Sequence, residues 1–562
     1  MARSLPECVD TVIIGNGPSA LILSYILHGH VPYYIGSHHD TILDAKLQKS
    51  PRLLDLTSDL YAHFLSSLRY STQALPVNTL LDTLIRPNAD TEINPKSCVA
   101  WRYEPERAVS HLVIGETSQV GGQWAENPVS ASEDIGTLSY AEQLSLPGYS
   151  YADYLAKSGK EDECDFVRPS RTEFADYLKT YPEAVGISNA MRTGLRVDRV
   201  HRSHNGFVIG SLNIHCKHLV LASGTFTVNI SSPPVLAPIA QLDLQQEPLL
   251  VIGSGFSAAD VILSAHPTRK IIHLYRWAPE HRPSPLKGCH HTAYPEYATV
   301  YRQMKIAAIA ATKTRSARSP LMRRKSNPFF NQRDWTVYEG LPNAEIVQVT
   351  NTESAGSATI VIKLSSGEEI TRRVGGLAYV VGRRGTLNYL SSDLRAEIFS
   401  SHDPDSAELE SSSLVSGRTL RAKAESECSL EVAKNVFITG SLTGDSLIRH
   451  AVGGCVFTAG RILGAIPSTY TSDDNPSTAS STPRSLSPDS SSHSEPQANG
   501  SPQRPRTGRS TPGELTNGHA DLHLDRRKLA RAVEQAHTQN REWAESGWWA
   551  GGPGSGRTNA LR

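Results

Sequence analysis

Near the start of this 562-residue chain stands Asp10-Thr11-Val12-Ile13-Ile14-Gly15-Asn16-Gly17-Pro18-Ser19-Ala20-Leu21-Ile22-Leu23, and the rest of the chain is interpreted from it. An apolar run, a glycine turn and a second apolar run predict a buried parallel strand followed by a packed helix. Gly15 permits the tight turn, Gly17 lets the backbone approach a pyrophosphate, and Ala20 allows close contact between helix and strand. The stretch therefore predicts a dinucleotide site, with a purely structural glycine turn as the alternative.

A second copy of this pattern lies much further along the chain, in Leu249-Leu250-Val251-Ile252-Gly253-Ser254-Gly255-Phe256-Ser257-Ala258-Ala259-Asp260. Gly253, Gly255 and Ser257 are its candidate cofactor-binding residues. Two phosphate-binding turns in one chain predict two bound dinucleotides. We expect an α/β fold with two Rossmann-like domains.

The strand predicted after the second turn, residues 271–275, ends directly before Arg276. An acidic residue at this place selects NAD, whereas an arginine accommodates the 2′-phosphate of NADP. The sequence therefore favours NADPH as the second dinucleotide. Arg269, Lys270 and Arg282 are the competing phosphate ligands.

After the first predicted helix, residues 32–36 are expected to form the second strand of the first unit. Gly36 and Ser37 stand where such a strand usually ends in an acid that binds a ribose hydroxyl. Asp40 is the nearest acid, and we expect it to be solvated. Residues 41–84 have a helical pattern and are interpreted as an insertion.

Two later segments resemble flavin-dependent enzymes. A predicted strand at 109–114 precedes Glu116 and then Gly121-Gly122-Gln123-Trp124, which resembles flavin-dependent monooxygenases, where the glycines pass close to the flavin and the Trp packs nearby. A glycine turn beside a core Trp is the alternative. Residues 436–445 are similar to the closing strand of flavoproteins with two dinucleotides, whose Asp, here Asp445, lies near the ribityl chain of FAD. A helix is expected from about Ser446, with Asp445 as its N-cap in the alternative interpretation.

The predicted domains follow from these motifs and from composition. From residue 468 to about 518 the chain is mostly Ser, Pro, Thr, Asn and Gly, which cannot bury enough apolar surface to offset the entropy of ordering. The expected division is an FAD-binding domain at 1–235 and 383–466, an NADPH-binding domain inserted at 236–382, a disordered linker at 467–520, and a short helix and tail at 521–562. Docking of the tail on a protein partner through its tryptophans is an alternative to a loosely ordered tail.

Composition excludes several other classes of protein. The 56 basic and 56 acidic residues balance, so no global field favours nucleic acid or an anionic membrane. No apolar run reaches the ~20 residues of a membrane span. The 7 cysteines contain no CxxC pair, which argues against a zinc site or a secreted disulfide framework, and no metal is expected. We expect a cytoplasmic protein; nuclear import through the basic cluster at 313–325 is weighed against a solvated loop there.

Taken together, the motifs resemble the oxidative stress-induced growth inhibitor family, which is itself similar to flavin-containing monooxygenases and to ornithine and lysine N-hydroxylases. The resemblance spans roughly 9–463 and rests on Gly15-Asn16-Gly17-Pro18-Ser19, His111-Leu112-Val113-Ile114-Gly115, Gly121-Gly122-Gln123-Trp124, Thr137-Leu138-Ser139, Tyr294-Pro295-Glu296-Tyr297, Gly444-Asp445 and Gly453-Gly454. It implies an NADPH-dependent flavin monooxygenase or oxidase, using FAD and molecular oxygen, linked to growth control, cell death or cytokinesis.

The chain departs from flavin-containing monooxygenases at one informative place. Their Asn before a Ser-Lys-Glu segment would fall near Leu138 or Ser139, and it is missing. Release of hydrogen peroxide is therefore an alternative to coupled oxygenation of a small-molecule substrate, which stays unidentified. Two further hypotheses are an amine N-hydroxylase and a non-catalytic nucleotide-binding regulator. No catalytic side chain is nominated, because a flavin performs the oxygen chemistry itself.

Overall fold

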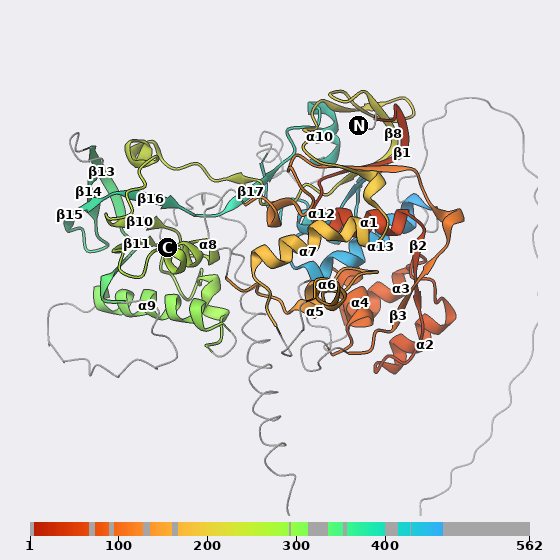
Figure 1. The fold of residues 1–562 in the computed structure, drawn as a ribbon, viewed down its shortest axis with the longest axis horizontal. Coiled ribbons are helices and arrows are strands. Elements are labelled where there is room, and N and C mark those ends of the chain that lie inside the picture. The colour runs from red at the N-terminus through yellow and green to blue at the C-terminus, as the bar shows by residue number, and fades with distance from the viewer. Residues whose placement is uncertain are drawn as a thin grey trace, which may run out of the picture. The chain divides into compact units, whose positions relative to one another are not determined.

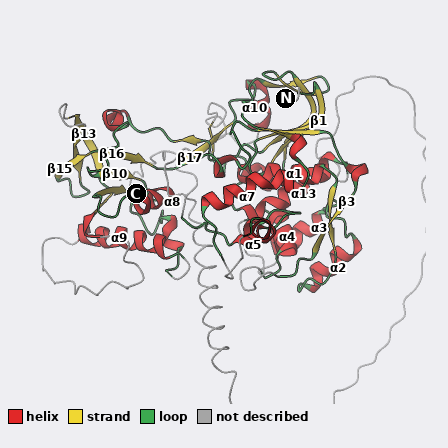
Figure 2. Ribbon diagram, viewed as in Figure 1, coloured by secondary structure: helices red, strands yellow, loops and turns green. Residues whose placement is uncertain are grey.

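The computed structural model describes residues 5–66, 74–88, 95–127, 135–159, 167–291, 294–312, 335–351, 357–399, 414–426 and 429–464. Within these ranges the chain is mixed α/β, which confirms the predicted fold class (Figure 2). The basic cluster at 313–325, the predicted linker and the predicted tail lie outside the described residues.

The first sheet is built on the strand that carries the first glycine turn. In the described part of the chain it has eight strands, with β19-β20-β8-β1-β4-β5 as its main order. β1 pairs in parallel with β4 on one side and with β8 on the other, and β6 and β7 extend β8 as an antiparallel hairpin. The strands are β1 (Cys8–Ile14), β4 (His111–Ile114), β5 (Met191–Arg192), β6 (Val200–Ser203), β7 (Gly206–Ile209), β8 (Ile214–Leu221), β19 (Glu431–Ala433) and β20 (Val436–Ile438).

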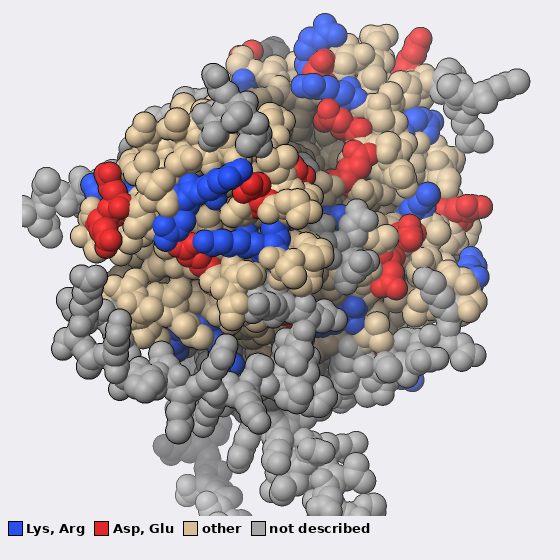
Figure 3. Space-filling view, turned by 60° about the vertical axis from the view of Figure 1, so that its left-hand side comes forward, with Lys and Arg blue, Asp and Glu red and all other residues tan. Residues whose placement is uncertain are grey.

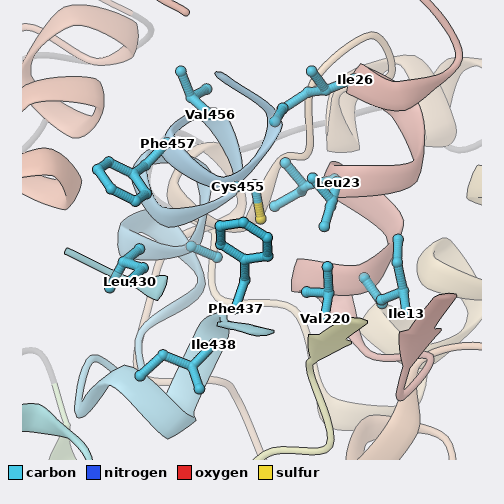
Figure 4. Close-up of a cluster of buried hydrophobic side chains, with 14 of the residues drawn as sticks. Ile13, Leu23, Ile26, Val220, Leu430, Phe437, Ile438, Cys455, Val456 and Phe457 are labelled. Atoms are coloured by element: carbon cyan, nitrogen blue, oxygen red, sulfur yellow. The ribbon is translucent and has the colours of Figure 1, made fainter. Parts of the chain in front are cut away.

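Two helices from opposite ends of the described chain pack together against this sheet. They are α1 (Pro18–Leu27), which is buried along most of its length, and α13 (Ala451–Ile462). Figure 4 shows Val220 and Phe437 of the sheet beside Leu23 of α1 and Cys455 of α13. Fully apolar strands and helices are expected where a parallel sheet is covered, because neither element then faces water. This core joins the first and last described segments.

The second strand of the first unit was predicted wrongly. β2 (His30–Tyr34) does not join β1; it pairs antiparallel with β3 (Val99–Tyr103) in a separate two-stranded sheet. The parallel neighbours of β1 are β4 and β8, with Ile14 opposite Ile114 and Leu221. The insertion therefore lies between α1 and β4, and it holds the predicted helices as α2 (Thr41–Lys49), α3 (Ser58–Ser66) and α4 (Pro76–Ile85). Strand pairing depends on contacts between distant segments, which a local pattern does not specify.

Asp40 also differs from its prediction. Its carboxylate is buried, accepts hydrogen bonds from the amides of Ile42 and Leu43, and lies 3.0 Å from Nε2 of His63. It is the N-cap of α2 and not a solvated side chain.

The remaining elements of this part of the chain cover the sheet and its edges. α7 begins with a capping box in which the side chains of Ser170 and Glu173 each accept a hydrogen bond from the other residue's backbone amide, as its sequence predicted. Its Phe174, Tyr177 and Leu178 are buried. These elements are α5 (Ala141–Leu144), α6 (Tyr151–Lys157), α7 (Arg171–Ala184), α10 (Ser392–Phe399) and α12 (Arg421–Ser426), with a small sheet of β9 (Val228–Asn229), β17 (Arg383–Thr386) and β18 (Leu414–Val415).

A second parallel sheet carries the second glycine turn (Figure 1). Its order is β12-β11-β10-β16, and an antiparallel sheet of β13, β14 and β15 packs on it through Ile360 and Ile362. The buried members of the first core stop at Leu221 and resume at Leu387, so this sheet has a core of its own. Its elements are β10 (Leu249–Ile252), α8 (Phe256–Ser264), β11 (Ile271–Tyr275), α9 (Pro295–Thr312), β12 (Tyr338–Pro342), β13 (Glu345–Asn351), β14 (Ala358–Lys363), β15 (Glu369–Val374) and β16 (Gly376–Tyr379).

Basic and acidic side chains are interspersed on the face drawn in Figure 3. Glu339, for example, pairs with both Lys270 and Arg372, at 3.1 and 2.6 Å. Among the described helices, none combines the length and apolarity that crossing a bilayer requires. In the part of the chain that the structure describes, no group of three or more His, Cys, Asp or Glu side chains is placed to hold a metal ion.

Candidate functional site

The first glycine turn lies at the carboxyl end of β1, where the backbone excludes side chains at one position and leaves room at another. Gly15 has φ +118°, and a Cβ there would lie 2.3 Å from the carbonyl oxygen of Ala222, at the end of β8. A Cβ on Gly17, which precedes α1, would meet no atom within 4 Å. The turn is thus forced tight by glycine and open on its outer side. An open glycine at a helix N-terminus is the arrangement that accepts a pyrophosphate.

The Gly121-Gly122 segment lies against this turn. A Cβ on Gly122 would lie 3.3 Å from Cα of Gly17, and the amide of Gly121 donates to the carbonyl of Asn16 at 2.8 Å. The buried Asn16 side chain holds the loop from the other side, because its Nδ2 donates to the Thr117 hydroxyl and to the Gln119 carbonyl. The structure therefore brings together two predicted glycine motifs that lie about a hundred residues apart in sequence. Asn16, which was not among the predicted site residues, makes the connection.

Glu116, one of the predicted cofactor-binding residues, lies just beyond a strand that pairs with β1. Because β4 is parallel to β1, the residues that follow it lie at the same carboxyl edge of the sheet as Gly15. Glu116 comes two residues after the end of β4 and is exposed. Its carboxylate follows a strand that pairs in parallel with β1, which is the position in the fold where a dinucleotide-binding unit carries its ribose-binding acid. The acid that was expected at Gly36 and Ser37 is missing there because the preceding strand, β2, pairs with β3 and not with β1.

Ala20 and Trp124, two further predicted site residues, both belong to the packing of the first core. The ring of Trp124 meets that of Phe174 edge to face, with centroids 4.9 Å apart. Ala20 is fully buried in the first turns of α1.

The helix start predicted near Ser446 is wrong, and so is the alternative interpretation of Asp445 as the N-cap of that helix. Helix α13 begins at Ala451, and Asp445 is not its N-cap. Its Oδ2 accepts from the amide of Leu75 at 2.8 Å and from Nδ2 of Asn78 at 2.6 Å, so it caps the distant helix α4. Its Oδ1 accepts from Arg421 at 2.6 Å. The carboxylate therefore fixes the closing loop to the insertion, a partner that no local pattern indicates.

The second glycine turn has the same construction at the end of β10. Gly253 has φ +152°, and a Cβ there would lie 2.4 Å from the carbonyl oxygen of Val380, after β16. A Cβ on Gly255 would meet only Pro285, at an ordinary contact distance of 3.8 Å. Ser257 lies in the first turn of α8, partly exposed. These three predicted residues are therefore together at one carboxyl edge.

The structure separates Arg276 from two of its competitors. Arg276 follows β11 directly, at the same carboxyl edge as Gly253, and is exposed. Arg269 is buried at the other end of β11 and donates to the carbonyls of Leu244 and Glu247. Lys270 pairs with Glu339 at that end as well. Arg276 and the exposed Arg282 stay as candidates for a phosphate.

The segment at 294–297 contacts residues from several other segments of the chain. The Tyr294 hydroxyl donates to the carbonyl of Leu138 at 2.8 Å, and the Arg168 guanidinium lies 4.8 Å from the centre of the Tyr294 ring. The Tyr297 hydroxyl donates at 2.8 Å to Oδ1 of Asp260, on α8. Burial raises the pKa of Asp260 to about 6, although the Tyr297 hydrogen bond acts in the other direction. Nothing in the spacing of these residues predicts the contacts, because each partner comes from a different segment.

Comparison with known proteins agrees with the motifs. The chain is 29% identical over 354 residues to oxidative stress-induced growth inhibitor 1 of Mus musculus, covering 55% of this chain and 72% of the relative. It is 27% identical over 351 residues to oxidative stress-induced growth inhibitor 2 of Homo sapiens, covering 52% and 68%. The predicted family resemblance is confirmed.

Solved structures similar to this chain include a flavin-containing monooxygenase from Stenotrophomonas maltophilia, with a TM-score of 0.42 at 14% identity, covering 82% of this chain and 98% of that one. The reduced form of ornithine hydroxylase from Pseudomonas aeruginosa has a TM-score of 0.41 at 14% identity, covering 82% and 99%. No family model matches the chain.

Proposed function

We propose that this chain is a flavoprotein oxidoreductase that binds FAD at the first glycine turn and NADPH at the second. The observation that carries the proposal is the duplication of one construction. Each parallel sheet ends in a tight glycine turn, at Gly15 and at Gly253, followed by a glycine with open or loosely packed surroundings, at Gly17 and at Gly255. We also propose the division into an FAD-binding part, 1–235 and 383–466, and an inserted NADPH-binding part, 236–382.

The residues present fit FAD at the first turn. The space over Gly17 admits a phosphate, and Pro18 at the start of α1 removes an amide that would otherwise lack a partner. Glu116 would accept hydrogen bonds from a ribose, and Gly121 and Gly122 would let the ligand pass close to the backbone. Asp445 would act by holding the closing loop in place through α4 and Arg421.

FAD, when bound, supplies hydride acceptance from NADPH and the reaction with molecular oxygen. The polypeptide contributes binding and orientation. Gly253, Gly255 and Ser257 would hold the pyrophosphate of NADPH, and Arg276 would bind its 2′-phosphate with charge-assisted hydrogen bonds. Whether oxygen is transferred to a small molecule or released as hydrogen peroxide is set by groups around the flavin ring, and both outcomes fall within the proposal.

An absorption spectrum of the purified full-length protein, recorded before and after NADPH is added without oxygen, tests the proposal. A flavin band that is lost on addition of NADPH and returns with air is the expected result. Purified protein that retains no flavin, even when refolded or expressed with excess FAD, contradicts it and favours a non-catalytic regulator. Turnover of ornithine or lysine with stoichiometric NADPH consumption would identify the amine N-hydroxylase alternative.

The relatives are named as inhibitors of growth, and we propose a role in growth control for this chain as well. The test compares growth of cells that express the wild-type chain with cells that express a Gly17→Val variant, with and without peroxide. Slower growth that depends on an intact first turn is expected. Equal effects of both chains would separate growth control from flavin binding.

A further inference from the structure

A histidine stands inside the second sheet at a place where the first sheet has an apolar residue. The two glycine turns are equivalent, so Val251 corresponds to Ile13. Val251 is opposite His273 in β11, whereas Ile13 is opposite Val113 in β4. His273 is fully buried, with Ile272 and Leu274 on either side of it in the strand. Burying an imidazole is unfavourable unless both ring nitrogens are hydrogen-bonded, so its presence calls for a reason specific to this sheet.

Both nitrogens of His273 are hydrogen-bonded. Nε2 lies 2.6 Å from the carbonyl oxygen of Gly253, and Nδ1 lies 2.8 Å from the hydroxyl of Tyr338 on β12. A carbonyl only accepts, so Nε2 carries the proton, and Nδ1 of the neutral ring accepts from the tyrosine. Burial lowers the pKa of His273 to about 4, which keeps the ring neutral near pH 7. Tyr338 therefore donates a hydrogen bond to His273, and His273 donates one to the carbonyl of Gly253 in the second turn.

The contact with Gly253 fixes the direction of the next amide. In a trans peptide the C=O and N–H groups point in opposite directions, so holding the Gly253 carbonyl toward β11 turns the Ser254 amide away from it. The Ser254 carbonyl is held in the same way by the Ser284 hydroxyl at 2.6 Å, which orients the Gly255 amide. Within the described residues neither of these two amides has a hydrogen-bond acceptor. Two oriented donors at a helix N-terminus form an anion-binding site.

We infer that His273, fixed by Tyr338, is a positioning residue for the second turn: it aims the Ser254 amide at the pyrophosphate of the bound dinucleotide. The inference rests on the proposed binding of NADPH and adds a residue that touches no ligand. It also assigns the two phosphate-bearing parts of NADPH, the pyrophosphate and the 2′-phosphate, to different residues. His273 and Tyr338 serve the pyrophosphate, whereas Arg276 serves the 2′-phosphate at the end of β11.

Binding of two probes to the purified full-length protein tests this division. NADP⁺ carries both the pyrophosphate and the 2′-phosphate, whereas adenosine 2′-monophosphate carries only the latter. Tyr338→Phe, which removes one hydroxyl and keeps the ring, is expected to weaken NADP⁺ about two- to tenfold and to leave adenosine 2′-monophosphate unchanged. His273→Val, which installs the residue of the first sheet, is expected to weaken NADP⁺ at least as much. Arg276→Ala is expected to weaken both probes.

Tyr275→Phe is the matched control, because it removes a buried tyrosine hydroxyl in the same sheet whose 2.6 Å hydrogen bond goes to the carbonyl of Met304. It should leave NADP⁺ binding unchanged, and flavin content checks that each variant is folded. Unaltered NADP⁺ affinity in Tyr338→Phe, or an equal loss in Tyr275→Phe, would overturn the inference. Failure of the wild-type protein to bind NADP⁺ would instead refute the proposed function.

Discussion

At the scale of single residues, the two open glycines make a reciprocal pair of predictions. A Cβ on Gly17 would have no atom within 4 Å, so Gly17→Val directs a branched side chain into the open space that a phosphate would occupy. We expect retained flavin to fall below about a tenth of the wild-type content while NADP⁺ still binds. Gly255→Val should show the opposite pattern. Flavin absorbance and NADP⁺ titration measure the two; loss of both ligands in both variants would indicate unfolding instead.

Arg276 makes a second prediction at this scale. Arg276→Ala removes one or two charge-assisted hydrogen bonds to a 2′-phosphate, which corresponds to roughly a tenfold to several-hundredfold loss of NADPH affinity. NADH, which lacks that phosphate, should bind as before. Flavin reduction rates against both nucleotides measure the effect. Lys270→Ala is the control, since its amine pairs with Glu339 at the opposite end of β11. An unchanged NADPH dependence would shift the role to Arg282.

At the scale of elements, Asp445 shows how one carboxylate joins a loop, a helix and an arginine. Arg421 lies 2.6 Å from both Asp445 and Glu425, but the side chain of Asp445 is 5% exposed and that of Glu425 is 52% exposed. Asp445→Ala leaves Arg421 paired only with the exposed Glu425 and leaves the Leu75 amide and the Asn78 side chain, at the start of α4, without their acceptor, so it should cost about 3 kcal/mol of unfolding free energy. Glu425→Ala should cost about 0.5 kcal/mol or less. Denaturant unfolding measures both, and equal losses would contradict the capping role.

The pairing of α8 with α9 predicts a pH dependence. Burial raises the pKa of Asp260 from 3.8 to about 6, so the folded protein binds a proton more readily than the unfolded chain does. This group therefore favours folding less as pH rises from about 4 to 6, and above that range the loss is complete. Asp260→Asn, which can still accept from Tyr297, should raise unfolding free energy by about 1 to 3 kcal/mol at pH 7.

The measurement for Asp260 is the melting temperature of the wild-type and variant proteins across this pH range. The gain of Asp260→Asn should shrink steadily below pH 6, because the wild-type carboxyl becomes protonated as well. Tyr297→Phe serves as the comparison, since it removes the hydrogen bond that Asp260 accepts. A variant that is less stable than wild type at pH 7 would show that the charge of Asp260 is stabilising.

At the scale of the whole molecule, the described core ends with α13, which packs on α1 and α4. Truncation after Gly464 removes a segment that is poor in large apolar residues until its final tryptophans. We expect the shortened protein to keep its melting temperature to within about 2 °C and to keep both nucleotide sites. Truncation before α13 removes the buried face of Cys455 and should prevent folding. Loss of flavin on removal of the tail alone would assign the tail a part in binding.

Local patterns were sufficient for much of this protein. The structure has three local features where the sequence predicted them: both strand–turn–helix units, the helices of the insertion, and the capping box of Ser170 with Glu173. Each of these depends on residues within a few positions of one another. The positive φ angles of Gly15 and Gly253 follow from the same short-range pattern. The family resemblance also came from such motifs.

Only the tertiary structure determined which strands lie beside β1, and hence that Glu116, already a predicted site residue, stands at the same sheet edge as Gly15. It also determined that Asp445 caps α4 and that His273 holds the second turn. The physical reason is common to all three. A parallel strand finds its neighbour, and a buried polar group finds its hydrogen-bond partner, among segments far apart in sequence, so the spacing of residues along the chain carries no record of the choice.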